Sequence, residues 1–333
     1  MRRYFQVSTM AMALVGFMLV VLPSIYDSRS FLILMTQIFI FAIFAMSYDI
    51  LLGFTGIVSF GHAMFFGIGA YSTGVILDRF DHTLPYFFLA ILVGSLISTF
   101  ISFIVGLLTL RLKSHYYAML TLAFSGLFLV AAEKWRTLTK GNDGFTFRVP
   151  DVMIDRTTFY FICLALMLFV YFFLKRITQS PFGKVMLAIR ENEQRTESLG
   201  FTILHYKVLA SILAGVTASL AGSFYVMSLR FVNTSVFSID TTLDALLMTI
   251  IGGVGTLAGP ILGAGLIEFA HHWLTELAKE HPIFERWLIF FGILYIVAVM
   301  FFPAGIVGTI QKWGRKKQTP SKKQSIEKHK AAG

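Results

Sequence analysis

Two glycine-rich runs hold the residues whose types and spacing best fit a transport function. They cover residues 53–71 and 252–265. Glycine lets helices approach closely in lipid, and it permits non-helical backbone, which is tolerated at membrane depth only where it is buried or lines a cavity. Paired glycine-broken spans therefore predict a translocation path. The predicted path residues are Gly53, Gly56, Ser59, Gly61, His62, Gly69, Tyr71, Gly252, Gly253, Gly255 and Gly259. The alternative is close helix packing alone.

Few ionisable side chains lie within the apolar segments. His62 could hydrogen bond within the fold or take part in transport directly. Asp49 and Asp244 lie near the ends of apolar segments. Acids inside a membrane are costly and are often functional, although both could also sit at the lipid surface. His271 and His272 are adjacent, so they point to different faces of a helix, and a metal site formed by this pair is not expected.

The motifs of common enzymes are missing from the sequence. It has no G-x-x-x-x-G-K-[ST] loop to bind the phosphates of ATP, and no G-x-S-x-G, H-E-x-x-H or C-x-x-C pattern. We therefore expect neither an enzyme activity nor a cofactor or metal in this chain. Energy for any transport must come from a gradient or from another subunit.

The composition predicts that these runs sit among membrane-spanning helices. Hydrophobic residues make up 56% of the 333 residues and charged residues 14%, against about 25% in soluble domains. A spanning helix needs about 20 mainly apolar residues. The candidate spans cover residues 7–25, 31–52, 60–77, 86–110, 116–133, 158–176, 207–228 and 287–303. The first, although it follows Arg2 and Arg3, lacks a clear cleavage site, so we interpret it as a retained helix and not as a signal peptide.

The segment 242–275 is too long for one span and is broken by glycines and Pro260. A single crossing would place the basic C-terminal tail outside, against the positive-inside rule. Two crossings, 242–252 and 259–275, place 18 of the 28 Lys and Arg residues inside. We therefore predict an all-α, polytopic protein with about ten transmembrane helices and both termini cytoplasmic. Residues 1–308 form the transmembrane domain in this prediction, and residues 309–333 form a basic, disordered cytoplasmic tail.

The sequence of the longest cytoplasmic loop, residues 178–207, predicts a short helix that docks on a partner. Ser180 is suited to the N-cap, Pro181 to the first turn and Gly200 to the C-terminal cap. A small apolar face and a dense charge pattern favour docking to a partner over a solvated linker. Glu191, Glu193, Arg195 and Glu197 bring the charge to the exposed surface of this helix.

Three runs, in order, resemble the LivM type of branched-chain amino acid ABC transporter permeases. They are G-x-x-G-x-x-S-x-G-H-A-x-F-F-G-x-G-A-Y at 53–71, P-F-G-K-x-x-x-A-I-R-E-N-E at 181–193 followed by E-S-L-G, and G-G-V-G-T-L-A-G-P-x-L-G-A at 252–264. The resemblance covers about residues 30–308. The outer loop 139–145 departs from the family, which commonly has two glycines after the Thr and a Leu near the end. That departure weakens inference about the substrate.

The resemblance implies a multi-pass permease in a bacterial inner membrane that imports branched-chain or related amino acids by alternating access. It implies a LivH-like second permease, two cytoplasmic ATPase subunits that bind ATP, and an extracytoplasmic substrate-binding protein. The helix expected at 182–199 would be the contact with an ATPase. The contact residues that the resemblance implies are Arg190, Glu191, Asn192, Glu193, Glu197 and Gly200.

Two groups of alternatives stay open. Similar permeases carry urea, short amides or aromatic acids. The other group changes the class of protein. A gradient-driven secondary transporter has glycine-broken spans as well, and a channel-like or scaffold protein without energy coupling is the other possible class. Uptake that depends on ATPase partners would separate these classes from the importer.

Overall fold

The structure is a computed structural model that describes residues 28–109, 114–280 and 305–309, together with positions 19, 23, 292, 296 and 300. The predicted spans 7–25 and 287–303 and the tail 309–333 lie almost entirely outside the described residues. The predictions on the termini are therefore not tested by the structure.

Apolar segments of the first half form four long helices. They are α2 (Arg29–Asp49), which continues as a π-helix (Ile50–Thr55), α3 (Ala63–Arg79), α4 (Leu84–Thr109) and α5 (Ser114–Lys134). Short elements follow: α6 (Arg136–Thr139), a 3₁₀ turn (Gly141–Asp143), β1 (Phe145–Thr146) and a second 3₁₀ turn (Asp151–Met153).

The second half begins with α7 (Arg156–Gln179), whose N-cap is Asp155. The Asp155 carboxylate accepts hydrogen bonds from the backbone N–H and the hydroxyl of Thr158, at 2.9 and 2.8 Å. These bonds favour the ionised carboxylate and lower the pKa of Asp155. The remaining elements are α8 (Pro181–Glu191), α9 (Glu193–Ser198), α10 (Ile203–Leu229), β2 (Phe231–Val232), a 3₁₀ turn (Thr234–Phe237), α11 (Ile239–Gly252) and α12 (Ala258–Glu280).

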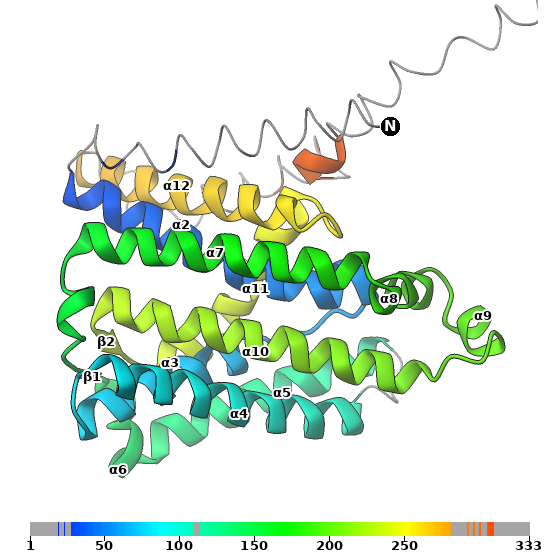
Figure 1. The fold of residues 1–333 in the computed structure, drawn as a ribbon, viewed down its shortest axis with the longest axis horizontal. Helices are drawn as coiled ribbons and strands as arrows, with labels where there is room; N and C mark the ends of the chain where they lie inside the picture. Colours follow the sequence, from blue (N-terminus) through cyan, green and yellow to red (C-terminus); the bar gives the residue numbers. More distant parts are fainter. Residues whose placement is uncertain are drawn as a thin grey trace, which may run out of the picture.

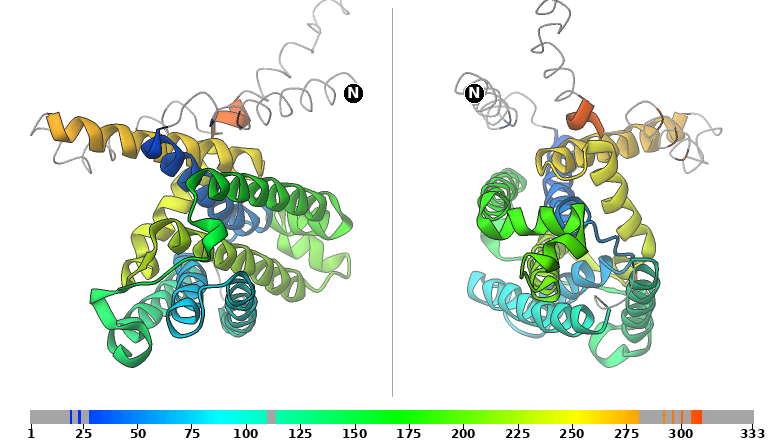
Figure 2. Two further views of the ribbon diagram at one scale, coloured as in Figure 1. Left: turned by 60° about the vertical axis from the view of Figure 1, so that its left-hand side comes forward. Right: turned by 90° about the vertical axis from the view of Figure 1, so that its right-hand side faces the viewer.

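The long helices form one bundle around α2 and α10. Helix α10 packs against α2, α3 and α4, and α2 also packs against α7, α11 and α12. Helix α12 lies on one side of the bundle and α4 and α5 lie on the other, with α7 and α10 between them (Figures 1 and 2). The single cysteine, Cys163, is fully buried in α7.

Two ends of the bundle can be told apart by their connections. We call the end formed by residues 53–62, 180–202 and 253–257 the loop end; it carries α8 and α9 on the right of Figure 1. We call the end formed by residues 135–155 and 230–238 the ribbon end; it carries the antiparallel pair β1 and β2 on the left of that view. The predicted topology places the loop end in the cytoplasm.

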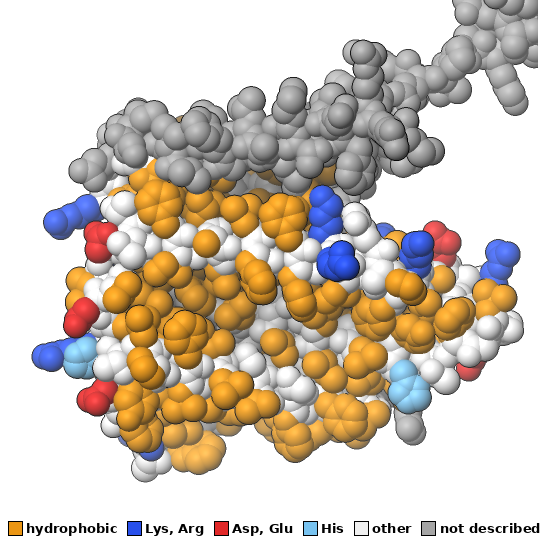
Figure 3. Space-filling model, in the orientation of Figure 1, with side chains coloured by type: hydrophobic (Ala, Val, Ile, Leu, Met, Phe, Trp, Pro, Cys, Tyr) orange, Lys and Arg blue, Asp and Glu red, His pale blue; other side chains and the backbone are white. Residues whose placement is uncertain are grey.

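The outer surface fits a bilayer. Hydrophobic side chains cover the middle of the face in Figure 3, and charged side chains gather at its two ends. On α4 an exposed stripe at four-residue spacing consists of Phe88, Leu92, Leu96 and Phe100. Because exposed apolar area of this kind is unfavourable in water, it indicates contact with lipid or another subunit. Five of the described helices are long and apolar enough to cross a membrane: 29–55, 84–108, 116–134, 156–179 and 203–229.

The difficult segment 242–275 does form two helices, α11 and α12, separated at residues 253–257. The predicted break is therefore confirmed. Helix α11 has 14 residues, a length of about 21 Å at 1.5 Å per residue. It is shorter than the hydrocarbon core of about 30 Å, so by itself α11 is a partial span.

Candidate functional site

The turn after α2 is where the first glycine-rich run begins. The helix widens into the π-helix 50–55 and ends at Gly56, whose φ of +74° is the left-handed conformation that glycine adopts without strain. Short π-helical segments are rare and often occur at functional positions. The widened turn therefore marks this part of α2 as a place to look for function.

His62 and Ser59 fasten this turn to α2. The His62 ring is fully buried, and its Nε2 lies 2.8 Å from the Ser47 hydroxyl. Its ring stacks on Phe44 with centroids 5.4 Å apart. Tyr48 donates a hydrogen bond of 3.0 Å to the Ser59 carbonyl. Both predicted residues thus hold the fold together here, and the Nδ1 of His62 has no hydrogen-bond partner in the described part of the chain.

Gly61 and Gly69 lie where backbones touch. A Cβ atom at Gly61 would overlap the Thr121 carbonyl of α5, and one at Gly69 would overlap the Ser219 carbonyl of α10. Both glycines are buried within the subunit. In this conformation they permit close helix packing, so a role in lining a path would require α3 to separate from its neighbours.

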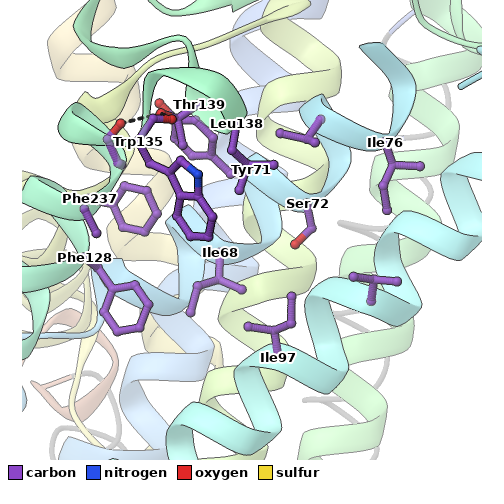
Figure 4. Close-up of a pocket in the computed structure, with 14 residues that line it drawn as sticks. Ile68, Tyr71, Ser72, Ile76, Ile97, Phe128, Trp135, Leu138, Thr139 and Phe237 are labelled. Carbon is purple, nitrogen blue, oxygen red and sulfur yellow. Dashed lines mark hydrogen bonds between the residues drawn. The ribbon is translucent and has the colours of Figure 1, made fainter. Parts of the chain in front are cut away.

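Tyr71 faces an apolar cavity near the ribbon end (Figure 4). The cavity has a volume of about 380 Å³ and lies among α3, α4 and α5. The Tyr71 ring stacks on Phe237 at 5.5 Å, and its hydroxyl is buried without a hydrogen-bond partner among the described residues. Of the predicted path residues, Tyr71 is the one that lines this cavity.

The second glycine-rich run forms the turn between α11 and α12. A Cβ atom at Gly252 would overlap the Gly259 carbonyl, so the two helices nearly touch where they meet. Gly253 and Gly255 have φ values of +129° and +80°, which L-residues rarely adopt. Leu257 also has a positive φ, of +53°, without the freedom of a glycine. The turn is thus tight and partly strained.

Asp49 joins the two glycine-rich turns. Its carboxylate accepts hydrogen bonds from the backbone N–H groups of Gly255, at 2.7 Å, and Leu257, at 3.2 Å. The side chain is fully buried at the last residue of α2. The sequence indicated an unusual acid at this position. It could not indicate that the partner is a turn about 200 residues later.

Arg190 brings the motif at 181–193 to the same place. Its guanidinium donates a short hydrogen bond to the Gly53 carbonyl. A Cβ atom added at Gly56 would lie 3.1 Å from Arg190 Cγ, and one at Gly255 would lie 3.0 Å from its Nη1. The side chain of a predicted docking residue therefore lies against both glycine-rich turns.

The expected single helix at 182–199 is wrong, because the structure has two helices that meet at Asn192. Asn192 is extended, with φ of −162°, and its side chain caps α9 by accepting the Arg195 N–H at 2.9 Å. An asparagine at a helix start competes with continued helix in this way. Gly200 follows α9 at φ +89°, as its capping role requires.

The other predicted docking residues divide into two kinds. Glu193 pairs with the largely buried Lys207 at 2.5 Å, so it ties α9 to α10. Glu191 and Glu197 are exposed. Leu199 is 70% exposed beside them, and a leucine this exposed on a polar loop is unusual enough to indicate a contact surface.

Sequence reasoning missed two threonines of α11. Thr242 accepts the Ala63 N–H at 2.9 Å, and Thr249 donates to the Ala45 carbonyl at 3.1 Å. They are seven residues apart, which places them on one face of a helix. This spacing of polar residues within an apolar segment was the available signal. Among the described residues no group of three or more His, Cys, Asp or Glu side chains is placed to hold a metal ion.

Comparisons with known proteins agree on one family. The model of a family described as "Branched-chain amino acid transport system / permease component" matches residues 30–299. A LivM permease protein of a high-affinity branched-chain amino acid transport system in Salmonella typhimurium is 24% identical over 309 residues, covering 84% of this chain and 70% of that protein. A probable LivM permease protein of Methanocaldococcus jannaschii is 24% identical over 315 residues, covering 80% of this chain and 90% of that protein. The LivM protein of Escherichia coli is 22% identical over 309 residues, covering 84% of this chain and 70% of that protein. No solved structure matches the chain.

Proposed function

The chain belongs to the family of permease components of branched-chain amino acid transport systems, and on this premise we propose that it is a membrane-spanning subunit of an ATP-driven importer. The importer carries branched-chain or related amino acids into the cell. In this proposal the chain lies in the bacterial inner membrane and forms the path, and it has no ATPase site of its own.

The observation that carries the proposal is the convergence of three sequence motifs at the loop end. Asp49 contacts the α11–α12 turn, and Arg190 contacts the π-helix after α2. A loop that meets a partner on one side and both glycine-rich turns on the other is suited to pass motion from the partner into the membrane helices. A simple connecting loop needs no such contacts.

In the proposed mechanism, two ATPase subunits bind ATP and close, and the α8–α9 loop follows the motion of the ATPase on which it is docked. Glu191, Glu197 and Leu199 are the exposed groups through which we expect the docking to occur. An extracytoplasmic binding protein delivers the amino acid, and a LivH-like permease completes the path.

The proposed path runs beside the glycine-broken segments. These glycines are packed against neighbouring backbone in the present conformation. Alternating access would therefore slide or separate α3 and α12 from their partners at the points where glycines let the backbones touch. Small residues at such points lower the steric barrier to sliding.

The test is purification of the tagged chain from its own membranes, with identification of the associated subunits and assay of ATP hydrolysis. We expect two ATPases and a second permease with the unmodified chain, and a loss of the ATPases with Glu197→Lys. The matched control is Asp151→Lys, which reverses an exposed acid at the ribbon end. Normal ATPase recovery and uptake with Glu197→Lys would contradict the docking role.

The same preparation separates the alternatives. Uptake that continues without ATPase partners would favour a gradient-driven transporter. Uptake of urea, short amides or aromatic acids in preference to leucine would keep the importer and change its cargo.

A further inference from the structure

We propose that Asp49 and Arg190 form a latch that makes the α11–α12 turn follow the α8–α9 loop. The Asp49–Arg190 latch consists of two contacts: the Asp49 carboxylate with the Gly255 and Leu257 N–H groups, and the Arg190 guanidinium with the Gly53 carbonyl. The inference rests on the proposed function, because the loop is the proposed ATPase contact. It assigns to Asp49 and Arg190 a positioning role in energy coupling.

The Asp49 half of the latch holds a strained turn. Leu257, with φ of +53°, occupies the left-handed region, which costs a non-glycine residue roughly 1 kcal/mol. Successive N–H groups in such a turn form a concave site that favours an anion. The buried carboxylate occupies it with two hydrogen bonds. Removal of the negative charge should therefore let this turn relax.

The Arg190 half of the latch acts on the same face of α2. Gly53 lies in the π-helix that follows Asp49, directly beside the Asp49 carboxylate. A Cβ atom at Gly53 would overlap Asp49 Oδ1 and lie 2.5 Å from the Gly255 nitrogen. The two contacts are thus separated by little more than the Gly53 backbone. A displacement of Arg190 reaches the turn directly.

The chemistry of the pair suits a reversible latch. Arg190 is exposed at the end of α8 but directs its guanidinium inward to a backbone carbonyl. It also attracts the buried Asp49 carboxylate electrostatically. The Arg190 contact is a hydrogen bond from a solvent-exposed residue to a backbone carbonyl, so it can break and re-form without unpacking the apolar bundle, while the buried Asp49 carboxylate stays bonded to the turn. Lysine would keep the charge but would lose the planar fork of arginine.

The experiment uses the assembled complex in lipid vesicles, with leucine as the probe substrate. Uptake and ATP hydrolysis are measured together for Asp49→Asn, Arg190→Gln and the double variant. We expect hydrolysis within about twofold of the unmodified complex and leucine uptake per ATP lowered by roughly tenfold. Because both residues act through one element, the double variant should be no worse than the more severe single variant. Arg190→Lys should recover part of the loss.

A second readout does not depend on transport. Hydrogen exchange at the amides of Gly255 and Leu257 should become faster in Asp49→Asn and also in Arg190→Gln. Faster exchange in the Arg190 variant is diagnostic, since Arg190 makes no hydrogen bond to either amide among the described contacts. The control is Glu276→Gln, the same change from acid to amide on α12, where it removes only an exposed pair with Lys279.

Three outcomes decide the matter. Uncoupling together with faster exchange supports the latch. Unchanged exchange at Gly255 and unchanged uptake per ATP in both single variants would overturn it, as would an equal loss of uptake and hydrolysis, because that indicates a general structural role. If the unmodified chain binds no ATPase, the proposed function fails, but the exchange measurement still decides whether Arg190 controls the turn.

Discussion

The two ends of the bundle are held together in different ways. At the ribbon end, short polar contacts join segments from several loops. Phe145 and Thr146 pair with Val232 and Phe231, and Thr234 donates to the Asn142 side chain at 2.8 Å. At the loop end, Asp49 and Arg190 reach backbone groups of two glycine-rich turns.

The difference shows where movement is easiest. Breaking the ribbon end apart would require several independent contacts and a strand pair to be lost together. At the loop end, the α8–α9 loop reaches the glycine turns through Arg190, which donates a hydrogen bond to the Gly53 carbonyl and can exchange it without loss of a strand pair. We therefore expect the ribbon end to move as one body and the loop end to be the part that responds to a partner.

The largest effect is expected from Gly53→Ala at the loop end. The new methyl group would overlap Asp49 Oδ1 and crowd the Gly255 nitrogen, so α2 and the α11–α12 turn would have to move apart. Overpacking of this kind costs about 3 kcal/mol at its upper end. We expect loss of leucine uptake and a lower unfolding temperature of the purified complex.

Gly126→Ala is the control for this prediction. No atom lies within 4 Å of the Cβ that it would add on α5. Alanine favours a helix over glycine by up to about 1 kcal/mol, so stability should be equal or slightly higher. If Gly53→Ala were as harmless as Gly126→Ala, the close approach of Gly53 to Asp49 and to the α11–α12 turn would be contradicted.

A smaller effect is expected from Asn192→Ala. Loss of the α9 cap costs about 1 kcal/mol, which should weaken binding of the ATPase about fivefold in a titration of detergent-solubilised complex. The counterpart at the ribbon end is Asn142→Ala, which removes the Thr234 hydrogen bond. It should lower stability by a similar amount and leave ATPase binding unchanged. Equal weakening of ATPase binding by both variants would break the distinction between the ends.

The smallest effect is expected from Lys140→Gln. This change removes a pair with Asp78 at 2.7 Å, in which the Lys140 side chain is half exposed, and a contact of the ammonium group with the Phe145 ring at 4.6 Å. Such pairs contribute about 0.5 kcal/mol and are screened by salt. Uptake should be unchanged, and the unfolding temperature should fall by no more than about 2 °C. A large loss of uptake would mean that this outer loop does more than connect helices.

Much of the fold could be predicted because its signals are local. The apolar lengths of α2, α4, α5, α7 and α10 identify them as spans, and glycines with Pro260 mark the break after α11. The split at Asn192 was missed because an asparagine within a run of helix-forming residues can either continue the helix or cap a new one. Only the surrounding packing decides between these.

The candidate site was predictable in its parts and not in its assembly. The sequence singled out Asp49, Arg190 and Gly255 separately, for charge, motif and glycine content. Their contacts join residues 137 and 206 positions apart. The hydrophobic periodicity of a helix does not predict which distant residues it will contact, because the register between helices is set by side-chain packing over the whole bundle. For the same reason the backbone partners of Gly61 and Gly69 could not be foreseen.

The burial of Cys163 has a practical consequence for chemical labelling. Because the thiol lies on the buried face of α7 with no exposed surface, maleimide and disulfide reagents should reach it slowly. This chain has no other cysteine. A cysteine introduced on the exposed α9 region can therefore carry a fluorophore or spin label against a nearly silent natural background, with no need for a cysteine-free variant.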